Sequence, residues 1–264
     1  MDVIIEALRA TAWRMEPQPL FGAFHLTYTG IGLAICVLLA YLLRGMSERR
    51  HAVLLTSLGI LLIISEVYKQ LFWRYAIGYT EYPWIILPFH LCSMPLYILP
   101  IVAWLPKGRV REALYAFLAS FCLAGGLISV LVDGGLLRDY WAMTVHSLTW
   151  HVLLVFVGLY LGLSGRLDDG IRGFARGAAV FCALALVAFL LNVALTDLSN
   201  GACDMFFVGP GPMNVAVYRD IAPVVGRPLT TLIYLLTLTI ASYLCWLLAT
   251  HLPKRRFHSA EKQQ

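Results

Sequence analysis

The chain has 264 residues, of which 60% are apolar and only 13% are charged. Soluble domains carry about 25% charged residues, so this composition excludes an ordinary soluble protein and predicts an integral membrane protein. The net charge is +5, but the basic residues are scattered between apolar stretches, so we expect no nucleic-acid binding. Membrane lipids are the expected partners, and the oligomeric state stays open.

Three regions follow one another along the chain. Residues 1–25 form a short amphipathic segment that we expect to lie in the membrane interface. Residues 26–250 contain seven apolar stretches long enough to cross a bilayer, which predicts an all-α, seven-transmembrane-helix bundle. Residues 251–264 form a basic tail. The seven stretches cover about 26–43, 52–73, 82–104, 112–132, 141–163, 174–195 and 228–250.

The distribution of Lys and Arg predicts the orientation. The loops after the first, third and fifth stretches hold three each and the tail holds four, thirteen in total, against six on the opposite side. Basic residues favour the cytoplasmic side of a membrane. We therefore expect a multi-pass protein of the plasma (inner) membrane, with its N-terminus outside and its C-terminus in the cytoplasm.

The third stretch, Tyr82–Trp104, differs from a plain membrane anchor. It carries His90 and Cys92 in its body, and prolines at Pro88, Pro95 and Pro100, within an otherwise apolar run. Ionisable groups at membrane depth are costly, and they usually face a cavity or a partner. We interpret the stretch as lining a polar pocket; the alternative is that His90 only donates a hydrogen bond to a neighbouring helix.

The second stretch contains Glu66 and Lys69, which share a helical face at i, i+3 and can form an ion pair. This pair either neutralises two charges for membrane insertion or takes part in catalysis or substrate binding. The fifth stretch contains His146 and His151. Almost no ionisable residue falls in the inner halves of the stretches.

Depth within the membrane groups these polar residues. With a rise of about 1.5 Å per residue, Glu66 and His90 lie about 10 Å from the outer ends of their stretches, and His146 and His151 about 7 and 15 Å. Asn192 lies at the outer end of the sixth stretch. The sequence therefore predicts one cavity that opens outward beneath the long loop of residues 196–227.

Helical spacing limits which side chains can cooperate. On a regular helix His90 and Cys92 point about 160° apart, so they share a cavity only if the prolines distort the backbone. Ser147 and His151 share a face, but a serine in a helix commonly bonds its own backbone. His90, a second histidine and Glu66 are ligand types that suit zinc. No spacing signature supports such a site, so we expect no metal and no cofactor.

Four motifs carry a resemblance to known proteins. They are SEVYK, LPFHLC, WHVLLVFVGLYL and LSNGACDMFF, in that order between Ser65 and Phe207. Together they resemble the YwaF-like family of bacterial membrane proteins. More distantly, the chain is similar to the mammalian multi-span acyltransferase that makes polyunsaturated ether phospholipids.

The resemblance implies roles for single residues. In the mammalian relative an Asn-Pro-Cys-His motif carries the proposed acyl-accepting cysteine. Pro88 and His90 match its proline and histidine, and His151 matches a later histidine. Phe89 stands at the position of the cysteine, and a phenyl ring cannot hold an acyl group. If thiol chemistry is retained, Cys92 has taken over the role.

The remaining matches are a glutamate in the second stretch and two loop residues. Glu66 matches the glutamate, and Asn200 and Cys203 match an asparagine and a cysteine that follow the sixth stretch.

Three functions remain open at this point. The first is a lipid acyltransferase or lipid hydrolase-like enzyme, with His151 as general base, His90 as a second acid–base group, Cys92 as nucleophile and Glu66 as an orienting group. The second is a protein that binds or transports a lipid or a small polar substrate. The third is a structural role without catalysis. The candidate substrate-binding residues are Lys69, His146, Asn192 and Asn200.

Overall fold

Every regular element of the protein is a helix within the part that the computed structural model describes, residues 2–251. The prediction of an all-α protein is confirmed. The helices are α1 (Asp2–Ala10), α2 (Ala23–Leu43), α3 (Glu48–Leu71), η1 (Phe72–Ala76), η2 (Trp84–Ile86), η3 (Leu91–Ser93), α4 (Met94–Val102), α5 (Arg109–Phe117), η4 (Leu118–Cys122), α6 (Leu123–Val132), η5 (Gly134–Leu136), α7 (Trp141–Leu163), α8 (Ile171–Ala194), η6 (Met205–Phe207), α9 (Tyr218–Val225) and α10 (Arg227–His251).

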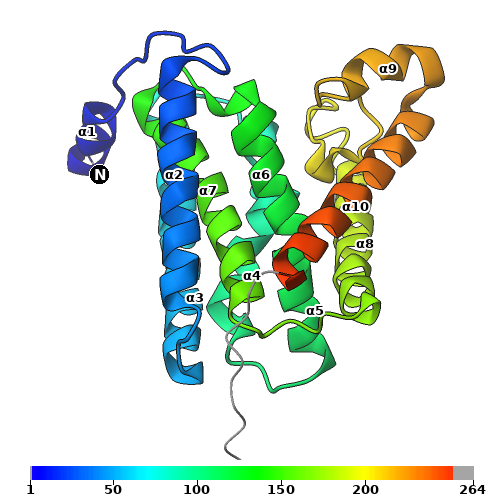
Figure 1. Cartoon of the computed structure of the whole chain (residues 1–264). Helices are drawn as coiled ribbons and strands as arrows, with labels where there is room; N and C mark the ends of the chain where they lie inside the picture. Colours follow the sequence, from blue (N-terminus) through cyan, green and yellow to red (C-terminus); the bar gives the residue numbers. More distant parts are fainter. Residues whose placement is uncertain (1, 252–264) are drawn as a thin grey trace, which may run out of the picture.

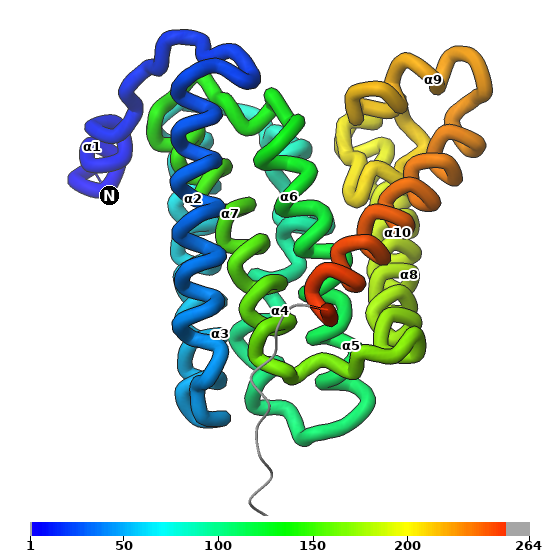
Figure 2. The backbone as a smooth tube through the Cα atoms, in the orientation of Figure 1, coloured from blue at the N-terminus to red at the C-terminus, as the bar shows by residue number. Residues whose placement is uncertain are grey.

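The long helices pack into one bundle (Figure 1). Among the described residues, six helical stretches are long and apolar enough to cross a membrane: α2, α3 with η1, α5 to α6, α7, α8 and α10. Within the bundle, α2 and α6 pack along α7, α3 packs along α4, and α5 packs along α8. We call the end with α1 and η1 the α1 end and the opposite end, where α5 begins, the α5 end (Figure 2).

The third predicted span is not a continuous helix, so the count of seven long helices is not reproduced. Its apolar helix covers only Leu91–Val102, about 18 Å at 1.5 Å per residue. Proline explains the break: Pro88 has no N–H to donate and disfavours a helix before it, and His90 is extended, with φ −95° and ψ 166°. Pro95 is accepted because it lies in the first turn of α4.

The N-terminal segment is attached to the α1 end of the bundle. The Met15 N–H donates to the Asp139 carbonyl oxygen at 2.8 Å, and the Trp141 N–H donates to the Trp13 carbonyl oxygen at 3.1 Å. The Val3 side chain on α1 is 79% exposed. An interfacial position for residues 1–25 stays a prediction. Of the predicted tail, residues 251–264, all but His251 lie outside the described residues.

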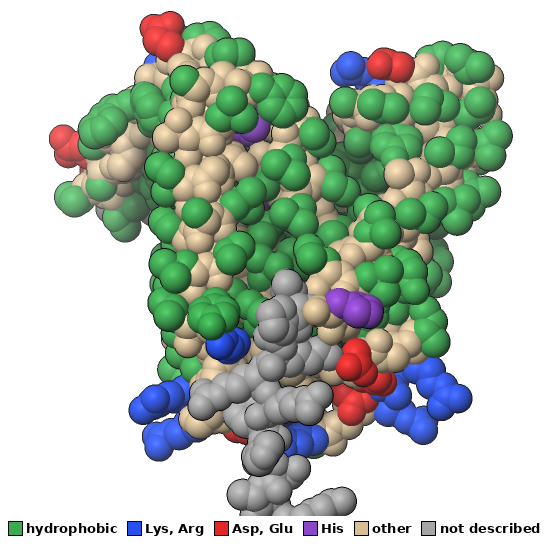
Figure 3. Space-filling model, in the orientation of Figure 1, with side chains coloured by type: hydrophobic (Ala, Val, Ile, Leu, Met, Phe, Trp, Pro, Cys, Tyr) green, Lys and Arg blue, Asp and Glu red, His purple; other side chains and the backbone are tan. Residues whose placement is uncertain are grey.

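The surface separates apolar from basic residues. Apolar side chains cover the sides of the bundle, while Lys and Arg side chains gather at the α5 end (Figure 3). Exposed apolar residues on α2 include Leu38 at 56% and Leu42 at 63%. Such exposure is unfavourable in water but suits lipid tails. The chain is therefore a multi-pass membrane protein surrounded by lipid.

Small residues allow the helices to approach closely. A Cβ atom at Gly59 of α3 would lie 2.5 Å from Cδ of Pro100 in α4, and one at Gly126 of α6 would lie 2.9 Å from the His151 carbonyl oxygen in α7. Lipid tails are as apolar as the side chains that they contact, so packing of this kind contributes much of the stability of a membrane bundle. Gly126 therefore lets α6 approach α7 closely.

A polar cluster at the α5 end was not expected from the sequence. Glu48 forms ion pairs with Arg111 at 2.9 Å and Arg166 at 3.0 Å, so that one carboxylate joins three chain segments. Fully buried His51 bonds to the Tyr115 hydroxyl at 2.7 Å and to the Tyr160 hydroxyl at 2.9 Å. The tyrosines lie far along the chain from His51, so no local pattern indicates these contacts.

We predict that Gly59→Ala lowers the melting temperature of the detergent-solubilised protein. The added methyl group must displace Pro100, and overpacking of a tight contact costs about 1–3 kcal/mol. Gly30→Ala on α2 is the matched control, because a Cβ there meets no atom within 4 Å. Alanine is the better helix former, so the control should keep or raise the melting temperature. Equal effects of the two changes would contradict the close α3–α4 contact.

Candidate functional site

The unwound segment between Pro83 and Met94 is the centre of the candidate site. Backbone carbonyls at membrane depth need hydrogen-bond donors, because no water is available there. Side chains supply them: the Ile86 oxygen accepts from Lys69 and Gln70, the Pro88 oxygen from the Tyr97 hydroxyl, the Leu91 oxygen from the Cys122 thiol, and the Cys92 oxygen from the Trp150 indole. Donors from α3, α4, η4 and α7 thus hold the segment in place.

The predicted Glu66–Lys69 ion pair is confirmed. Nζ of Lys69 lies 2.9 Å from Oε2 of Glu66, and the two side chains are 18% and 8% exposed. Nε2 of Gln70 donates to Oε1 of Glu66 at 2.7 Å and to the Ile86 oxygen at 3.0 Å. The pair and Gln70 therefore anchor the unwound segment.

Two internal histidines have both ring nitrogens occupied. Nδ1 of His25 accepts the Phe21 N–H at 3.2 Å, and its Nε2 donates to the Val130 carbonyl oxygen at 2.9 Å. His51 bonds to one tyrosine hydroxyl through each nitrogen. A fully paired imidazole has no nitrogen left for a ligand, so both residues are structural.

His90 and His146 differ from this pattern. Nδ1 of His90 and Nε2 of His146 are buried, and neither has a hydrogen-bond partner among the described residues. The His90 ring packs against Phe207, with ring centroids 5.3 Å apart, and the His146 ring stacks on Trp150 at 5.4 Å. Aromatic contacts thus fix both rings, while a polar atom on each is left available. Leaving a buried polar atom unpaired costs free energy, so such atoms are candidates for ligand contact.

His151 has a defined tautomer. Its Nδ1 lies 2.7 Å from the Ser147 carbonyl oxygen. A carbonyl only accepts hydrogen bonds, so in the neutral ring Nδ1 carries the proton and Nε2 keeps its lone pair. The Ser147 contact therefore orients the histidine through the backbone. Within residues 2–251 no hydrogen bond joins the Ser147 hydroxyl to His151.

Cys92 is positioned next to the histidines, but its thiol is not paired with one. The Trp150 indole donates to its carbonyl oxygen at 2.8 Å, which places the backbone of Cys92 against the turn of α7 that carries His146 and His151. No thiol–histidine hydrogen bond involving Cys92 is formed in the described part of the chain. The roles of His90, His151, Cys92 and Glu66 in catalysis stay predictions.

The long loop after α8 is fixed by Asn192. This fully buried side chain accepts the Met205 N–H at 2.7 Å and donates to the Met205 carbonyl oxygen at 2.9 Å. These bonds hold η6, where Phe206 and Phe207 both have a φ of 55°. Such conformations are unfavourable for bulky residues and need support from the surroundings. Asn192 thus positions Phe207 beside His90, and its predicted contact with a substrate stays a prediction.

Asn200 lies apart from the buried cluster. Its side chain is exposed, and its φ of 50° is left-handed, a conformation that asparagine tolerates in turns. Further along the loop, the Asp204 carboxylate accepts a hydrogen bond from the Gly209 N–H at 2.7 Å and forms an ion pair with Arg227 at 3.2 Å. Burial raises the pKa of Asp204, while the Gly209 N–H and the Arg227 charge favour its ionised form. Substrate binding by Asn200 stays a prediction.

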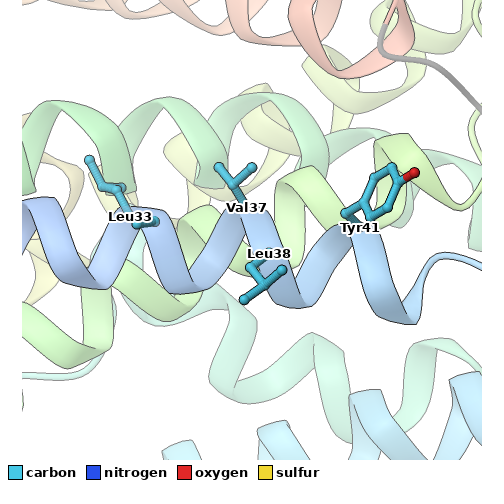
Figure 4. Close-up of a pocket in the computed structure, with 5 residues that line it drawn as sticks. Leu33, Val37, Leu38 and Tyr41 are labelled. Atoms are coloured by element: carbon cyan, nitrogen blue, oxygen red, sulfur yellow. The ribbon is translucent and has the colours of Figure 1, made fainter.

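The residue types that suit zinc, whose spacing in the sequence indicates no metal site, are not brought together in the described part of the chain. Among the described residues, no group of three or more His, Cys, Asp or Glu side chains is placed to hold a metal ion. A hollow on α2 is also unsuited to chemistry: it is lined by Leu33, Ala34, Val37, Leu38 and Tyr41 (Figure 4). None of these residues is a charged group, a histidine or a cysteine, and the hollow matches a contact surface for lipid tails.

Comparison with known proteins gives the family. The sequence model of the TMEM164 family matches residues 20–250. This chain belongs to the TMEM164 family. The match covers all six long apolar helices and the unwound segment. No curated protein and no solved structure matches the chain.

Sequence reasoning missed three residues that build the site. Gln70 and Trp150 donate to the unwound segment, and Phe207 packs on His90. Gln70 follows Glu66 by four residues, a spacing that indicates a pair on one helical face. For Trp150 and Phe207 only the quoted motifs, which contain both, pointed to the site.

We predict that Lys69→Met destabilises the protein strongly, because it leaves Glu66 buried without a counter-charge. Breaking a fully buried pair costs roughly 3–5 kcal/mol, and the cost here should be smaller because Lys69 is 18% exposed. The double variant Glu66→Gln/Lys69→Met should recover most of the loss. Thermal unfolding in detergent measures both. If the single and double variants melt together, the ion pair is not what holds the segment.

Proposed function

We propose that this protein is an integral membrane enzyme that transfers or hydrolyses acyl groups of membrane lipids at the site that holds Glu66, Lys69, His90, His146 and His151. One observation carries the proposal: His90 and His146 each keep a buried, unpaired ring nitrogen, while His25 and His51 are fully paired. Buried groups left unpaired near a positive charge often mark functional sites. The similarity of the quoted motifs to an acyltransferase supports the same reaction class.

The geometry suggests a role for each histidine. Nε2 of His151 acts as the general base and takes the proton from a nucleophile that attacks the ester carbonyl. The unpaired nitrogens of His90 and His146 hold lone pairs in the neutral rings, because the other nitrogen of each ring donates to a backbone carbonyl, that of Ile85 for His90 and that of Ser65 for His146. His90 acts as a second acid–base group, and His146 accepts a hydrogen bond from the substrate. The acyl C–O bond then breaks, and the proton on His151 passes to the departing alkoxide. The Glu66–Lys69 pair balances charge and holds the unwound segment during these steps.

The nucleophile is the Cys92 thiol, a lipid hydroxyl or water. Phe89 rules out the position that the acyltransferase uses. Cys92 lies beside the turn that carries the histidines, and attack by its thiol would form a thioester that a second lipid hydroxyl resolves. Lys69, His146, Asn192 and Asn200 complete the proposed substrate contacts, the first two inside the cluster and the others through the loop.

A second candidate function is binding or transport of a lipid or a small polar substrate. The unwound segment favours it, because interrupted helices at membrane depth also form the substrate sites of transporters. The same side chains would then coordinate the substrate without breaking a bond.

We further propose seven membrane crossings, with the unwound segment and α4 together as the third. The N-terminus is then outside and the C-terminus cytoplasmic, in a plasma (inner) membrane. The gathering of Lys and Arg at the α5 end supports this orientation (Figure 3), because basic residues favour the cytoplasmic side.

Lipid mass spectrometry tests the enzyme. We expect cells that express the wild type to change one phospholipid class, and His151→Ala to abolish the change because the base is lost. His90→Ala should reduce it by about 100- to 10,000-fold, because a second acid–base group is removed. Cys92→Ala shows whether the thiol participates.

His251→Ala is the matched control, because His251 is exposed at the end of α10. It should keep wild-type turnover at equal expression. Identical lipid profiles for all variants and for cells without the protein would contradict the enzyme and favour the binding or transport function.

Thiol labelling in intact cells tests the orientation. Gly134→Cys and Lys107→Cys place exposed thiols at the α1 end and the α5 end. A membrane-impermeant maleimide should label Gly134→Cys directly and Lys107→Cys only after permeabilisation. The wild type, with its native cysteines, gives the background. The reverse pattern would place the N-terminus in the cytoplasm.

A further inference from the structure

A cavity lies at the α1 end, outside the site that holds His90, His146 and His151. It has a volume of about 240 Å³. Residues from the end of α3, from η1 and from the loop that follows form its wall. They are Gln70, Trp73, Arg74, Tyr79, Thr80, Glu81, Tyr82, Pro83 and Ile86.

The loop is folded over this cavity by defined contacts. Nη1 of Arg74 donates to the Tyr79 carbonyl oxygen at 2.6 Å and to the Thr80 oxygen at 3.2 Å. Gly78, with a φ of 84°, makes the turn that brings these carbonyls back to η1. These contacts hold the loop in one position, so the shape of the cavity is defined by the fold.

Its chemistry combines aromatic rings with one charge of each sign. The rings of Trp73 and Tyr79 lie 5.4 Å apart at 41°, and Tyr82 adds a third ring to the wall. Among the described residues, the Glu81 carboxylate has no ion pair or hydrogen bond, and Arg74 uses only Nη1 for the loop. An anionic and a cationic group therefore remain available at one aromatic cavity.

The cavity lies next to the Glu66–Lys69 pair. Gln70 and Ile86 line the cavity, and the same two residues bond to the Glu66–Lys69 pair. A molecule seated in the cavity would thus lie one layer of side chains from the charged pair. The cavity also lies next to the end of α3 with η1, which is long and apolar enough to cross a membrane, and phospholipid headgroups are expected at the ends of such helices.

We propose that this cavity binds the headgroup of a zwitterionic phospholipid. The headgroup ammonium lies against the faces of Trp73, Tyr79 and Tyr82 and pairs with Glu81, since aromatic walls attract ammonium groups through their electron-rich faces. The phosphate oxygens accept hydrogen bonds from the remaining N–H groups of Arg74. An anionic headgroup without an amine gains nothing from Glu81 and is repelled by it. That the bound lipid is a substrate rests on the proposed function; the headgroup contact does not.

Binding of short-chain lipids to the purified full-length protein tests the proposal. We would titrate dihexanoyl phosphatidylethanolamine, phosphatidylcholine and phosphatidylglycerol by isothermal titration calorimetry. The wild type should bind phosphatidylethanolamine, phosphatidylcholine or both about tenfold more tightly than phosphatidylglycerol. The affinities for phosphatidylethanolamine and phosphatidylcholine show whether the cavity prefers a primary or a quaternary ammonium group.

Glu81→Gln should weaken binding of the preferred lipid about five- to tenfold and remove the preference over phosphatidylglycerol. Glu81 is exposed, so the variant should keep the wild-type melting temperature. Glu16→Gln, an exposed change outside the cavity, is the control and should bind like the wild type. Equal affinity of the wild type for all three lipids, or an unchanged preference in Glu81→Gln, would overturn the headgroup site.

The two proposals fail separately. Headgroup binding without any lipid turnover would refute the enzyme and keep the site. Turnover that depends on His151, together with no preference among headgroups, would refute the site and keep the enzyme.

Discussion

Pairing of backbone polar groups at membrane depth is the constraint on which this structure depends. The prolines of the third stretch free carbonyl oxygens that a regular helix would have used. In a hydrocarbon environment each unpaired oxygen costs several kcal/mol. The chain meets this demand with side chains from four neighbouring elements, including Lys69, Gln70 and Trp150. Lys69 and Gln70 therefore belong both to the polar site and to the contacts that stabilise the unwound segment.

Support and reactivity are divided among the histidines. His25 and His51 join helices and have no unpaired nitrogen, whereas His90 and His146 are held by aromatic contacts that leave a nitrogen available. His151 is held by its own helix, which fixes its tautomer. Histidine thus serves both packing and the candidate site, and the hydrogen-bond partners of its ring nitrogens distinguish the two uses.

Charge has different uses at the two ends of the bundle. At the α5 end Glu48 closes the structure by joining Arg111 and Arg166 across three segments. In the α1 half the Glu66–Lys69 pair lies deep among apolar helices, and beyond it Glu81 and Arg74 face a cavity. At the α5 end the charges pair with one another across the fold, whereas at the α1 end Glu81 and Arg74 keep polar groups at a cavity.

The sequence by itself determined the membrane class, the long apolar helices and the Glu66–Lys69 pair, because apolar length and i, i+3 spacing are local properties. It also selected His90, His146 and His151, since ionisable residues are rare at membrane depth. Tertiary structure decided that the third stretch unwinds, because most of the side chains that donate hydrogen bonds to its freed carbonyl oxygens lie on other helices. It likewise decided that Asn192 supports η6 and that His51 is buried between two tyrosines. Contacts between residues far apart in the chain leave no periodic signal in the sequence, so packing alone settles them.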